Sequence, residues 1–307
     1  MADLAFFNNK IVPIDEAKIS VKTHALHYGT SAFEGIRVNW RGDEKKFYIF
    51  RMPEHYQRLL RSCKILKMDL PYSIDKMCQI SVELVEKCDY EEDIYIRPIV
   101  YKSTEVVGVK LHDLECALAM FVIPFGPYID INNGIRCGMS SWRKINGDQM
   151  PNQAKIAGPY INHAMAKTEA IENGFDEAIL LTQKGYVSEG SGENIFIIMD
   201  GKIITPPPSD NILVGITRNS VIELARSELG IETIERSIDR SELYVADECF
   251  MTGTAAHVAP VIEIDRRKVG DGKIGPMTKK LQQLYFDVEQ GRNAKYMHWC
   301  TAVTPKK

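Results

Sequence analysis

The pattern of apolar and polar residues changes period several times within the first 125 residues. Lys46–Phe50, Ile94–Tyr101 and Ala117–Ile123 are short runs rich in β-branched and aromatic residues, which predicts strands. Between them, His55–Lys67 and Ile74–Cys88 carry apolar residues at helical spacing. This part of the chain is therefore predicted to form a small unit of mixed strands and helices.

A loop-like segment follows. Residues 124–134, PFGPYIDINNG, concentrate proline, glycine and asparagine, which is typical of a linker. We therefore expect a domain boundary at this segment. The expected division is a small α/β domain at residues 1–123 and a larger domain at residues 135–307.

The second part also mixes strands and helices. A strand is predicted at Ile135–Ser141, and a hairpin at Asn194–Met199 and Lys202–Thr205 around the Asp200-Gly201 turn. The chain shows neither regular βαβ alternation nor the GxGxxG motif of a dinucleotide fold, so the predicted fold class is mixed α/β, or α+β. Helices are predicted at Pro159–Asn173, Thr217–Leu229 and Pro276–Glu289.

Composition narrows the class of protein. Hydrophobic residues make up 45% and charged residues 26% of the chain, and 38 basic residues face 41 acidic ones without a single-sign block. This balance gives no indication of a nucleic-acid or membrane partner. The apolar run around Ala117–Ile123 is too short to span a bilayer, and the first residues lack a signal-peptide pattern. We expect a cytoplasmic protein that acts on a small molecule.

The 7 cysteines are odd in number, widely spaced and mostly set in apolar patterns. This usage is typical of reduced thiols in a protein core, and no pair has the CxxC spacing of a metal or redox site. They lie at positions 63, 78, 88, 116, 137, 249 and 300.

Lys155 is the one charged residue between Asp148 and Lys167, among small and apolar neighbours. A lysine kept away from water loses its proton more readily and can act as a nucleophile or Schiff-base former. A lysine in an exposed loop explains the segment almost as well, so this residue alone leaves both hypotheses open.

Two Gly-Thr segments could bind a phosphate. In LVGITR, Gly215-Ile216-Thr217 opens a predicted helix, where backbone N–H groups, the helix dipole and a hydroxyl would converge. In MTGTAA, residues 251–256 offer hydroxyls and a backbone that a ligand can approach closely. Either segment could equally be an ordinary helix cap or connection.

Three further charged residues are candidates for binding a ligand. Glu189, in SEGSGEN, precedes an apolar strand and needs a partner, which could be a ring nitrogen, although a polar loop explains it equally well. Arg97 interrupts the apolar strand IYIRPIVY and should pair with a buried protein carboxylate or with a substrate carboxylate. Arg58, in EHYQRLLRS, either binds an anion or is a solvated helix residue.

The segment HALHYGTSAFEGIR, residues 24–37, places His24 and His27 three residues apart. No third ligand in a matching context accompanies them, so no metal site is predicted. Tyr28 and Phe33 in the same segment could line an apolar pocket.

Taken together, these segments resemble the class IV (fold type IV) pyridoxal-phosphate aminotransferases, most closely the branched-chain amino acid aminotransferases. HYGTSAFEGIR, EHYQRL, YIRP, AKIAGPY, SEGSGEN, LVGITR and MTGTAA occur in family order over nearly the whole chain. The resemblance implies a small α/β domain and a larger pseudo-barrel-like domain with pyridoxal 5'-phosphate at their interface. It also implies ping-pong transfer of the amino group of L-leucine, L-isoleucine and L-valine to 2-oxoglutarate, by a homodimer or higher homo-oligomer.

The resemblance further implies roles for individual residues. Lys155 would hold the cofactor as a Schiff base and move the proton between the substrate Cα and the cofactor C4′. Glu189 would keep the pyridine nitrogen protonated, and Tyr160 would bond the ring hydroxyl. The rest of the cofactor site would be Arg58, Leu213, Gly215, Ile216, Thr217, Gly253 and Thr254. The substrate site would be Tyr28, Phe33, Gly35, Arg37, Tyr95, Arg97, Tyr128, Thr254, Ala255 and Ala256.

Alternatives remain within and outside this family. D-amino-acid aminotransferases, R-selective amine transaminases and aminodeoxychorismate lyases share the lysine, the glutamate and the phosphate site, but Tyr95, Arg97 and Phe33 favour the branched-chain member. His257, where an acidic residue is frequent, and Pro159, where asparagine is usual, depart from the family pattern. The alternative from another class is a non-catalytic protein that binds a phosphate ligand, in which Lys155 is incidental.

Overall fold

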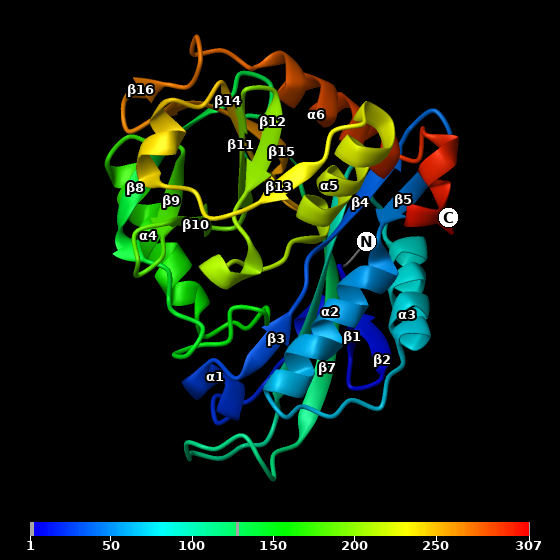
Figure 1. Cartoon of the computed structure of the whole chain (residues 1–307). Coiled ribbons are helices and arrows are strands. Elements are labelled where there is room, and N and C mark those ends of the chain that lie inside the picture. The colour runs from blue at the N-terminus through cyan, green and yellow to red at the C-terminus, as the bar shows by residue number, and fades with distance from the viewer. Residues whose placement is uncertain (1–2, 127–128, 307) are drawn as a thin grey trace. The chain divides into compact units, whose positions relative to one another are not determined.

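The computed structural model describes residues 3–126 and 129–306 (Figure 1). Contacts within the chain divide it into two compact units. Unit 1 consists of Met1–Gly126, Ala154–Gly158 and Asp287–Lys307, and unit 2 of Pro127–Gln153 and Pro159–Phe286.

The units are not contiguous stretches of chain, unlike the expected domains 1–123 and 135–307. The segment Ala154–Gly158 belongs to unit 1 because it pairs with strand β3 (Ser31–Phe33): the Phe33 N–H donates to Lys155 O and the Ala157 N–H to Ser31 O. The C-terminal strand β17 (Cys300–Val303) pairs with β5 (Lys46–Phe50) in the same unit. The domain boundary expected at residues 124–134 stays a prediction. Ala154–Gly158 and the C-terminal segment belong to unit 1, although they follow that boundary in the sequence.

Unit 1 is built on a sheet with strand order β17-β5-β4-β6-β7-β1-β2, with β3 beside β6. Helices α2 and α3 pack against each other and against strands of this sheet (Figure 1). The remaining strands are β1 (Leu4–Phe7), β2 (Lys10–Pro13), β4 (Ile36–Arg41), β6 (Ile94–Lys102) and β7 (Cys116–Pro124). The helices are α1 (His24–Tyr28), α2 (Met52–Ile65) and α3 (Ile74–Lys87), with 3₁₀ turns at Ile14–Glu16 and Ala294–Trp299.

The two-residue period of a strand sorts the residues of unit 1 between the two faces of its sheet. On β6, Ile94 and Ile96 enter the apolar core formed with α2 and α3. Tyr95 and Arg97 therefore lie on the opposite face. The neighbouring strand β4 repeats this pattern, and its Arg37 pairs with Tyr95. Alternation thus places these predicted substrate residues on one face.

Unit 2 is built on a sheet with strand order β10-β9-β8-β15-β14-β11-β12-β13, with β16 beside β15. Helix α4 packs on β8 and β9, and α5 on β13 and β14. The strands are β8 (Ile135–Arg143), β9 (Glu177–Leu181), β10 (Val187–Gly190), β11 (Asn194–Met199), β12 (Lys202–Thr205), β13 (Thr233–Glu235), β14 (Glu248–Gly253), β15 (His257–Ile264) and β16 (Arg267–Lys268). The helices are α4 (Tyr160–Glu172), α5 (Ile216–Leu229) and α6 (Pro276–Glu289), with 3₁₀ turns at Pro208–Asp210 and Arg240–Tyr244.

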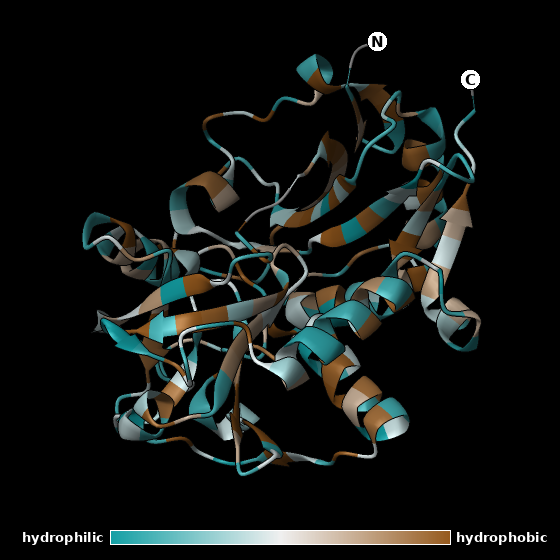
Figure 2. Cartoon of the chain, turned by 90° about the horizontal axis from the view of Figure 1, so that it is seen from above, coloured by the Kyte–Doolittle hydropathy of each residue, from teal (hydrophilic) through white to brown (hydrophobic). Residues whose placement is uncertain are grey.

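Strand β9 is buried along its whole length because both of its faces are covered. Ala178 and Leu180 pack with Ala166 and Ala170 of α4, while the residues between them enter the larger core of unit 2. The small alanine side chains let α4 approach the strand closely. Strands of the two sheets carry brown, apolar positions in Figure 2, and the helices show brown and teal positions on different sides.

Most predicted elements are confirmed, with small shifts at their ends. The Asp200-Gly201 hairpin turn has φ values of 49° and 72°, which suits the turn type that joins tightly paired strands. Helix α5 ends at Gly230, whose φ of 66° is left-handed. Helix α2 begins at Met52 rather than His55. Pro53 lacks a backbone N–H, but the first turn of a helix accepts proline because an N–H at that position would have no partner within the helix.

Among the described residues, no helix is both long and apolar enough to cross a membrane. The cysteines are free thiols, as expected from their spacing. Burial raises the pKa of the Cys63 and Cys300 thiols to about 12. These thiols are therefore protonated at neutral pH and unreactive.

Candidate active site

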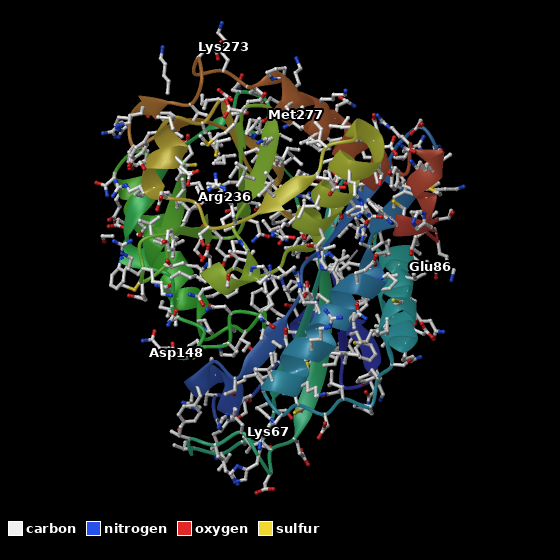
Figure 3. The ribbon with its side chains drawn as sticks, in the orientation of Figure 1. Lys67, Glu86, Asp148, Arg236, Lys273 and Met277 are labelled. Carbon is white, nitrogen blue, oxygen red and sulfur yellow. The ribbon has the colours of Figure 1, made fainter. Side chains whose placement is uncertain are left out.

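Lys155 is fixed within unit 1 through its own backbone. Its N–H donates to Ser62 Oγ at 3.0 Å, and its carbonyl accepts from the Phe33 N–H at 3.0 Å. Its Nζ lies 5.0 Å from the centre of the Phe33 ring. Asp148, the preceding charged residue of the sequence, is exposed on the outer loop of unit 2 (Figure 3). The uncharged segment around Lys155 is therefore held in unit 1 by backbone hydrogen bonds.

Arg58 of α2 is anchored on a buried carboxylate that the sequence analysis did not single out. Its Nε donates to Glu34 Oε1 at 2.7 Å and its Nη2 to Oε2 at 2.8 Å, while His55 Nδ1 lies 2.7 Å from Oε2. Burial acts to raise the pKa of Glu34, but Arg58 and then His55 outweigh it and hold that pKa well below its usual range. Arg58 therefore presents a rigid guanidinium.

Arg97 lies against two aromatic rings. Its guanidinium carbon is 5.0 Å from the centre of the Phe33 ring and 5.4 Å from that of Tyr95. Its Nε is buried and has no hydrogen-bond partner among the described residues. The Arg97 guanidinium is thus held against two aromatic rings, and its Nε can still donate a hydrogen bond to a ligand.

Tyr95 takes its position because residue 35 is glycine. A Cβ at Gly35 would lie 1.5 Å from the Tyr95 hydroxyl oxygen. The Tyr95 ring stacks on Phe125 with centres 4.7 Å apart. Arg37, predicted to meet substrate, donates from Nη1 to Phe125 O at 2.7 Å and lies over the same ring. Arg37 is buried and supports this aromatic pair.

Tyr28, a further predicted substrate residue, lies on the short helix α1. The Tyr28 hydroxyl accepts from the Gly108 N–H at 3.1 Å, which ties α1 to the loop before β7. Tyr128 lies outside the described residues. His24 and His27 contact backbone carbonyls, Gly108 O and Val21 O respectively.

Glu189 is the centre of the predicted residues in unit 2. Its Oε1 accepts from Lys144 Nζ at 2.5 Å, and its Oε2 accepts from the Leu213 N–H at 2.9 Å and from Asn194 Nδ2 at 3.2 Å. A carboxylate offers about four accepting positions, so one more donor can be accommodated. The predicted Leu213 takes part through its backbone. Lys144 and Asn194 were not singled out from the sequence.

Tyr160, the first residue of α4, stacks on His163 with ring centres 5.1 Å apart. His163 in turn lies 2.9 Å from Lys144 Nζ through its Nε2. The ring predicted to bond the cofactor hydroxyl and the carboxylate predicted to hold the ring nitrogen are thus linked within unit 2 by two residues that the sequence analysis missed.

The segment Gly215-Ile216-Thr217 forms the N-terminus of α5, as predicted. Gly215 is the residue before the helix and supplies no side-chain cap to its first turn. A Cβ at Gly215 would lie 2.3 Å from Asn194 Oδ1, so the close approach requires glycine. The Thr217 hydroxyl lies 3.4 Å from that of Tyr285 and is buried. Backbone N–H groups at such a helix end attract anions.

The second Gly-Thr segment is the turn between β14 and β15. Gly253 pairs with His257 across this turn, and His257 has a left-handed φ of 55°. Thr254 and Ala255 are partly exposed, whereas Ala256 belongs to the core of unit 2. The Ala256 side chain therefore packs into the core of unit 2, and its predicted part in substrate binding stays a prediction.

Five residues that surround the predicted ones were missed: Glu34, His55, Lys144, His163 and Asn194. Glu34 carried a usable signal, because a charge between Phe33 and the apolar strand β4 is as unusual as that of Glu189. His163 follows Tyr160 at helical spacing, which places both on one face of α4. Lys144 carried no signal, since its partner is far away in sequence.

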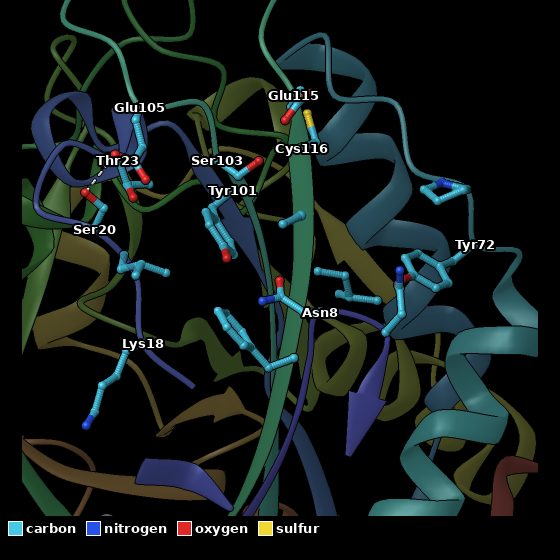
Figure 4. A pocket seen from close by; sticks show the side chains of 16 residues that line it. Asn8, Lys18, Ser20, Thr23, Tyr72, Tyr101, Ser103, Glu105, Glu115 and Cys116 are labelled. Atoms are coloured by element: carbon cyan, nitrogen blue, oxygen red, sulfur yellow. Dashed lines mark hydrogen bonds between the residues drawn. The ribbon is translucent and has the colours of Figure 1, made fainter. Parts of the chain in front are cut away.

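A separate hollow of about 410 Å³ lies on unit 1 (Figure 4). Its wall includes Tyr101, Glu115 and the hydrogen bond from Ser20 Oγ to Glu105 Oε2 at 3.0 Å. None of the described residues that line it is a predicted site residue. The hollow is therefore separate from the candidate active site.

Comparison with known proteins agrees with the motifs. The family model described as amino-transferase class IV matches residues 31–264. The probable branched-chain-amino-acid aminotransferase of Aquifex aeolicus is 52% identical over 304 residues, which cover 99% of this chain and 98% of that protein.

Solved structures agree with both the fold and the sequence. The branched-chain aminotransferase of the archaeon Thermoproteus uzoniensis, crystallised with norvaline, matches with a TM-score of 0.94 at 42% identity, over 98% of this chain and 99% of that one. The T.th. branched-chain amino acid aminotransferase complexed with N-(5'-phosphopyridoxyl)-L-glutamate matches with a TM-score of 0.92 at 40% identity, over 98% of both chains. These matches confirm the predicted mixed α/β fold, and with the family model they establish that the chain belongs to the class IV aminotransferases.

Proposed function

We propose that this enzyme is a pyridoxal-phosphate-dependent branched-chain amino acid aminotransferase. It transfers the amino group of L-leucine, L-isoleucine and L-valine to 2-oxoglutarate. The relatives named above are all branched-chain aminotransferases, which supports this activity over D-amino-acid or R-amine transamination and over a binding protein. The structural observation that carries the proposal is the Arg97 guanidinium on the wall of Phe33 and Tyr95.

The residues of each unit fit pyridoxal phosphate. When bound, the cofactor supplies an aldehyde carbon that joins an amine and a protonated ring that withdraws electrons from it. Lys155 offers the amine, and Glu189 keeps one accepting position for a ring N–H beside its three protein donors. The first turn of α5, without a side-chain cap, and the rigid guanidinium of Arg58 suit the phosphate.

Arg97 allows one site to take two kinds of substrate. An apolar branched chain needs aromatic or aliphatic walls, whereas glutamate brings a second carboxylate that needs a cation. Phe33 and Tyr95 provide such walls, and the buried Nε of Arg97 is a donor without a partner among the described residues. The related structures were crystallised with norvaline and with a glutamate conjugate of the cofactor, an apolar and an acidic side chain.

Lys155 also handles the proton in this proposal. Its Nζ, when the amine is free, would accept the proton from the substrate Cα and would later give one back. The Phe33 ring beneath Nζ restricts where the amine can lie. The backbone bonds of Lys155 to Ser62 and Phe33 hold the start of its side chain in place.

We also propose that the enzyme is a homodimer and that it acts in the cytoplasm. Val107 and Val109 are 75% and 91% exposed, and Leu26 on α1 is 60% exposed. The Gly108 contacts with His24 and Tyr28 place this loop beside α1, so the exposed side chains lie on one part of unit 1. An apolar surface of this kind is typical of an interface, and a second copy of the chain would cover it. The free thiols suit a reducing compartment.

The cofactor assignment is tested by colour and covalent trapping. Purified enzyme should absorb visible light, and borohydride should abolish that band and leave a pyridoxyl group on Lys155 in a peptide mass spectrum. Lys155→Ala should retain no covalent cofactor. A colourless protein that binds phosphate ligands equally well with and without Lys155 would support the binding-protein alternative instead.

A further inference from the structure

The side chain of Lys144 lies in the interior of unit 2 between Glu189 and His163. Its Nζ donates to Glu189 Oε1 at 2.5 Å and to His163 Nε2 at 2.9 Å. The side chains of Lys144 and Glu189 are only 4% and 5% exposed. Removing one partner of such a pair leaves the other charge without compensation in a place that water barely reaches. Lys144 is therefore the side-chain cation paired with Glu189.

The second hydrogen bond of His163 determines which ring nitrogen carries the proton. Its Nδ1 lies 2.7 Å from Ser191 O, and a carbonyl oxygen can only accept. Nδ1 therefore donates to Ser191, which leaves the lone pair of Nε2 in the neutral ring to accept from the Lys144 ammonium. His163 thus directs Lys144 Nζ while the same Nζ holds Glu189.

His163 also contacts the other residue assigned to the cofactor ring. It lies three residues after Tyr160 on α4, and the planes of the two rings are 20° apart with centres separated by 5.1 Å. One imidazole therefore touches Tyr160 directly and reaches Glu189 through Lys144. A change at His163 would disturb both assigned ring contacts while leaving the residues assigned to the phosphate in place.

We infer that His163 is a positioning residue for the cofactor ring, acting through Lys144 on Glu189. This inference rests on the proposed function. Lys144 holds Oε1 of Glu189, and Leu213 and Asn194 hold Oε2, so the carboxylate is fixed in orientation and points its remaining accepting position in one direction. Without His163, the Lys144 ammonium loses one of its two anchors and the carboxylate loses its fixed orientation.

The test uses three variants of the holoenzyme. His163→Phe keeps a ring to stack on Tyr160 and removes both hydrogen bonds, Lys144→Met removes the charge at similar length, and Lys144→Arg restores a cation. His163→Phe and Lys144→Met should shift the visible absorption maximum of the bound cofactor and lower kcat roughly tenfold, with KM for leucine changed less than about twofold. Lys144→Arg should recover most of kcat.

A double-mutant cycle separates positioning from general damage. If His163 acts through Glu189, the effect of His163→Phe on kcat should shrink to less than about twofold in a Glu189→Gln background. Equal losses in both backgrounds would overturn the inference. So would an unshifted spectrum with unchanged kcat in the single variants.

Lys167 provides a matched control. It lies one helical turn beyond His163 on α4 and pairs with the buried Glu177 in the same unit. Lys167→Met should lower the melting temperature without shifting the absorption maximum. If His163→Phe does not fold, His163→Leu, which also removes both hydrogen bonds, takes its place in the same measurements. A wild-type protein without a visible band would refute the proposed function, whereas a normal wild-type band with unshifted variants refutes only the role of His163.

Discussion

Arg58 and Glu34 are joined by two parallel hydrogen bonds, from Nε at 2.7 Å and from Nη2 at 2.8 Å. Such a bidentate pair fixes the plane of the guanidinium as well as its position. Glu34 is wholly buried, and His55 contacts the same carboxylate. Arg58, assigned to the phosphate of the cofactor, is thus set in place before any ligand binds.

Loss of this pair should weaken cofactor binding. We expect Glu34→Gln to raise the apparent Kd for pyridoxal phosphate roughly tenfold, because a neutral amide holds the guanidinium less firmly and one buried polar bond becomes mismatched. Cofactor titration followed by absorbance measures this. Arg61→Ala, an exposed arginine of the same helix, is the control and should bind like the wild type. An unchanged Kd in Glu34→Gln would separate Glu34 from cofactor binding.

Arg97 should discriminate between the two kinds of substrate. Arg97→Met keeps an apolar contact with Phe33 and Tyr95 but removes the cation, so KM for glutamate should rise roughly tenfold or more while KM for leucine changes less than about threefold. Steady-state kinetics with both amino acids measure the difference. Arg136→Met, at a half-exposed surface pair, is the control. Equal losses for both substrates would make Arg97 a structural residue.

Position 35 should tolerate no side chain. A Cβ added there would lie 1.5 Å from the Tyr95 hydroxyl oxygen, so Gly35→Ala must displace the ring that stacks on Phe125. We expect a loss of about 1–3 kcal/mol in the free energy of unfolding and a higher KM for leucine. Denaturant unfolding and kinetics measure these. Gly126→Ala is the control, since a Cβ there meets nothing within 4 Å. The two glycine variants behaving alike would contradict the packing described.

Glu193 should make stability depend on pH. Burial, and next the negative charge of Glu177, raise the pKa of Glu193 from 4.5 to about 8. The folded state therefore favours the protonated acid. The stabilisation is complete below about pH 4.5 and is lost as the pH rises towards 8. Glu193→Gln mimics the neutral acid. Its stability relative to the wild type should therefore increase as the pH rises from about 4.5 to about 8.

Thermal melts of both proteins at pH 5 and pH 9 measure the effect. The exposed Glu172→Gln on α4 serves as the control and should show no such change. A melting-temperature difference between Glu193→Gln and the wild type that does not vary with pH would mean that Glu193 is ionised in the folded protein throughout this range.

The local elements were predictable because their signals lie within short stretches of sequence. Helix α6 begins and ends where the pattern places it, at Pro276 and Glu289, and β5, β11 and β12 match their predicted runs. Period-two alternation also explains why Tyr95 and Arg97 share a face. The first turn of α2 was missed because the apolar period starts after it, although Pro53 was a usable signal.

The partners of the site residues were less predictable, because they come from distant parts of the chain. Lys144 meets Glu189 across 45 positions, and Glu34 meets Arg58 across 24. No local pattern encodes such a pairing, which depends on sheet order and helix packing. The return of Ala154–Gly158 to unit 1 was hidden for the same reason, since it rests on backbone bonds to β3.

Amino transfer from L-leucine to 2-oxoglutarate tests the central claim most directly. We predict that purified enzyme with pyridoxal phosphate forms L-glutamate from these two substrates, that L-isoleucine and L-valine replace L-leucine, and that Lys155→Ala lowers the rate by at least roughly a thousandfold. Glutamate measured by a coupled assay or chromatography gives the rate. Turnover of D-alanine or 1-phenylethylamine but not of L-leucine, or an unimpaired Lys155→Ala variant, would contradict the account.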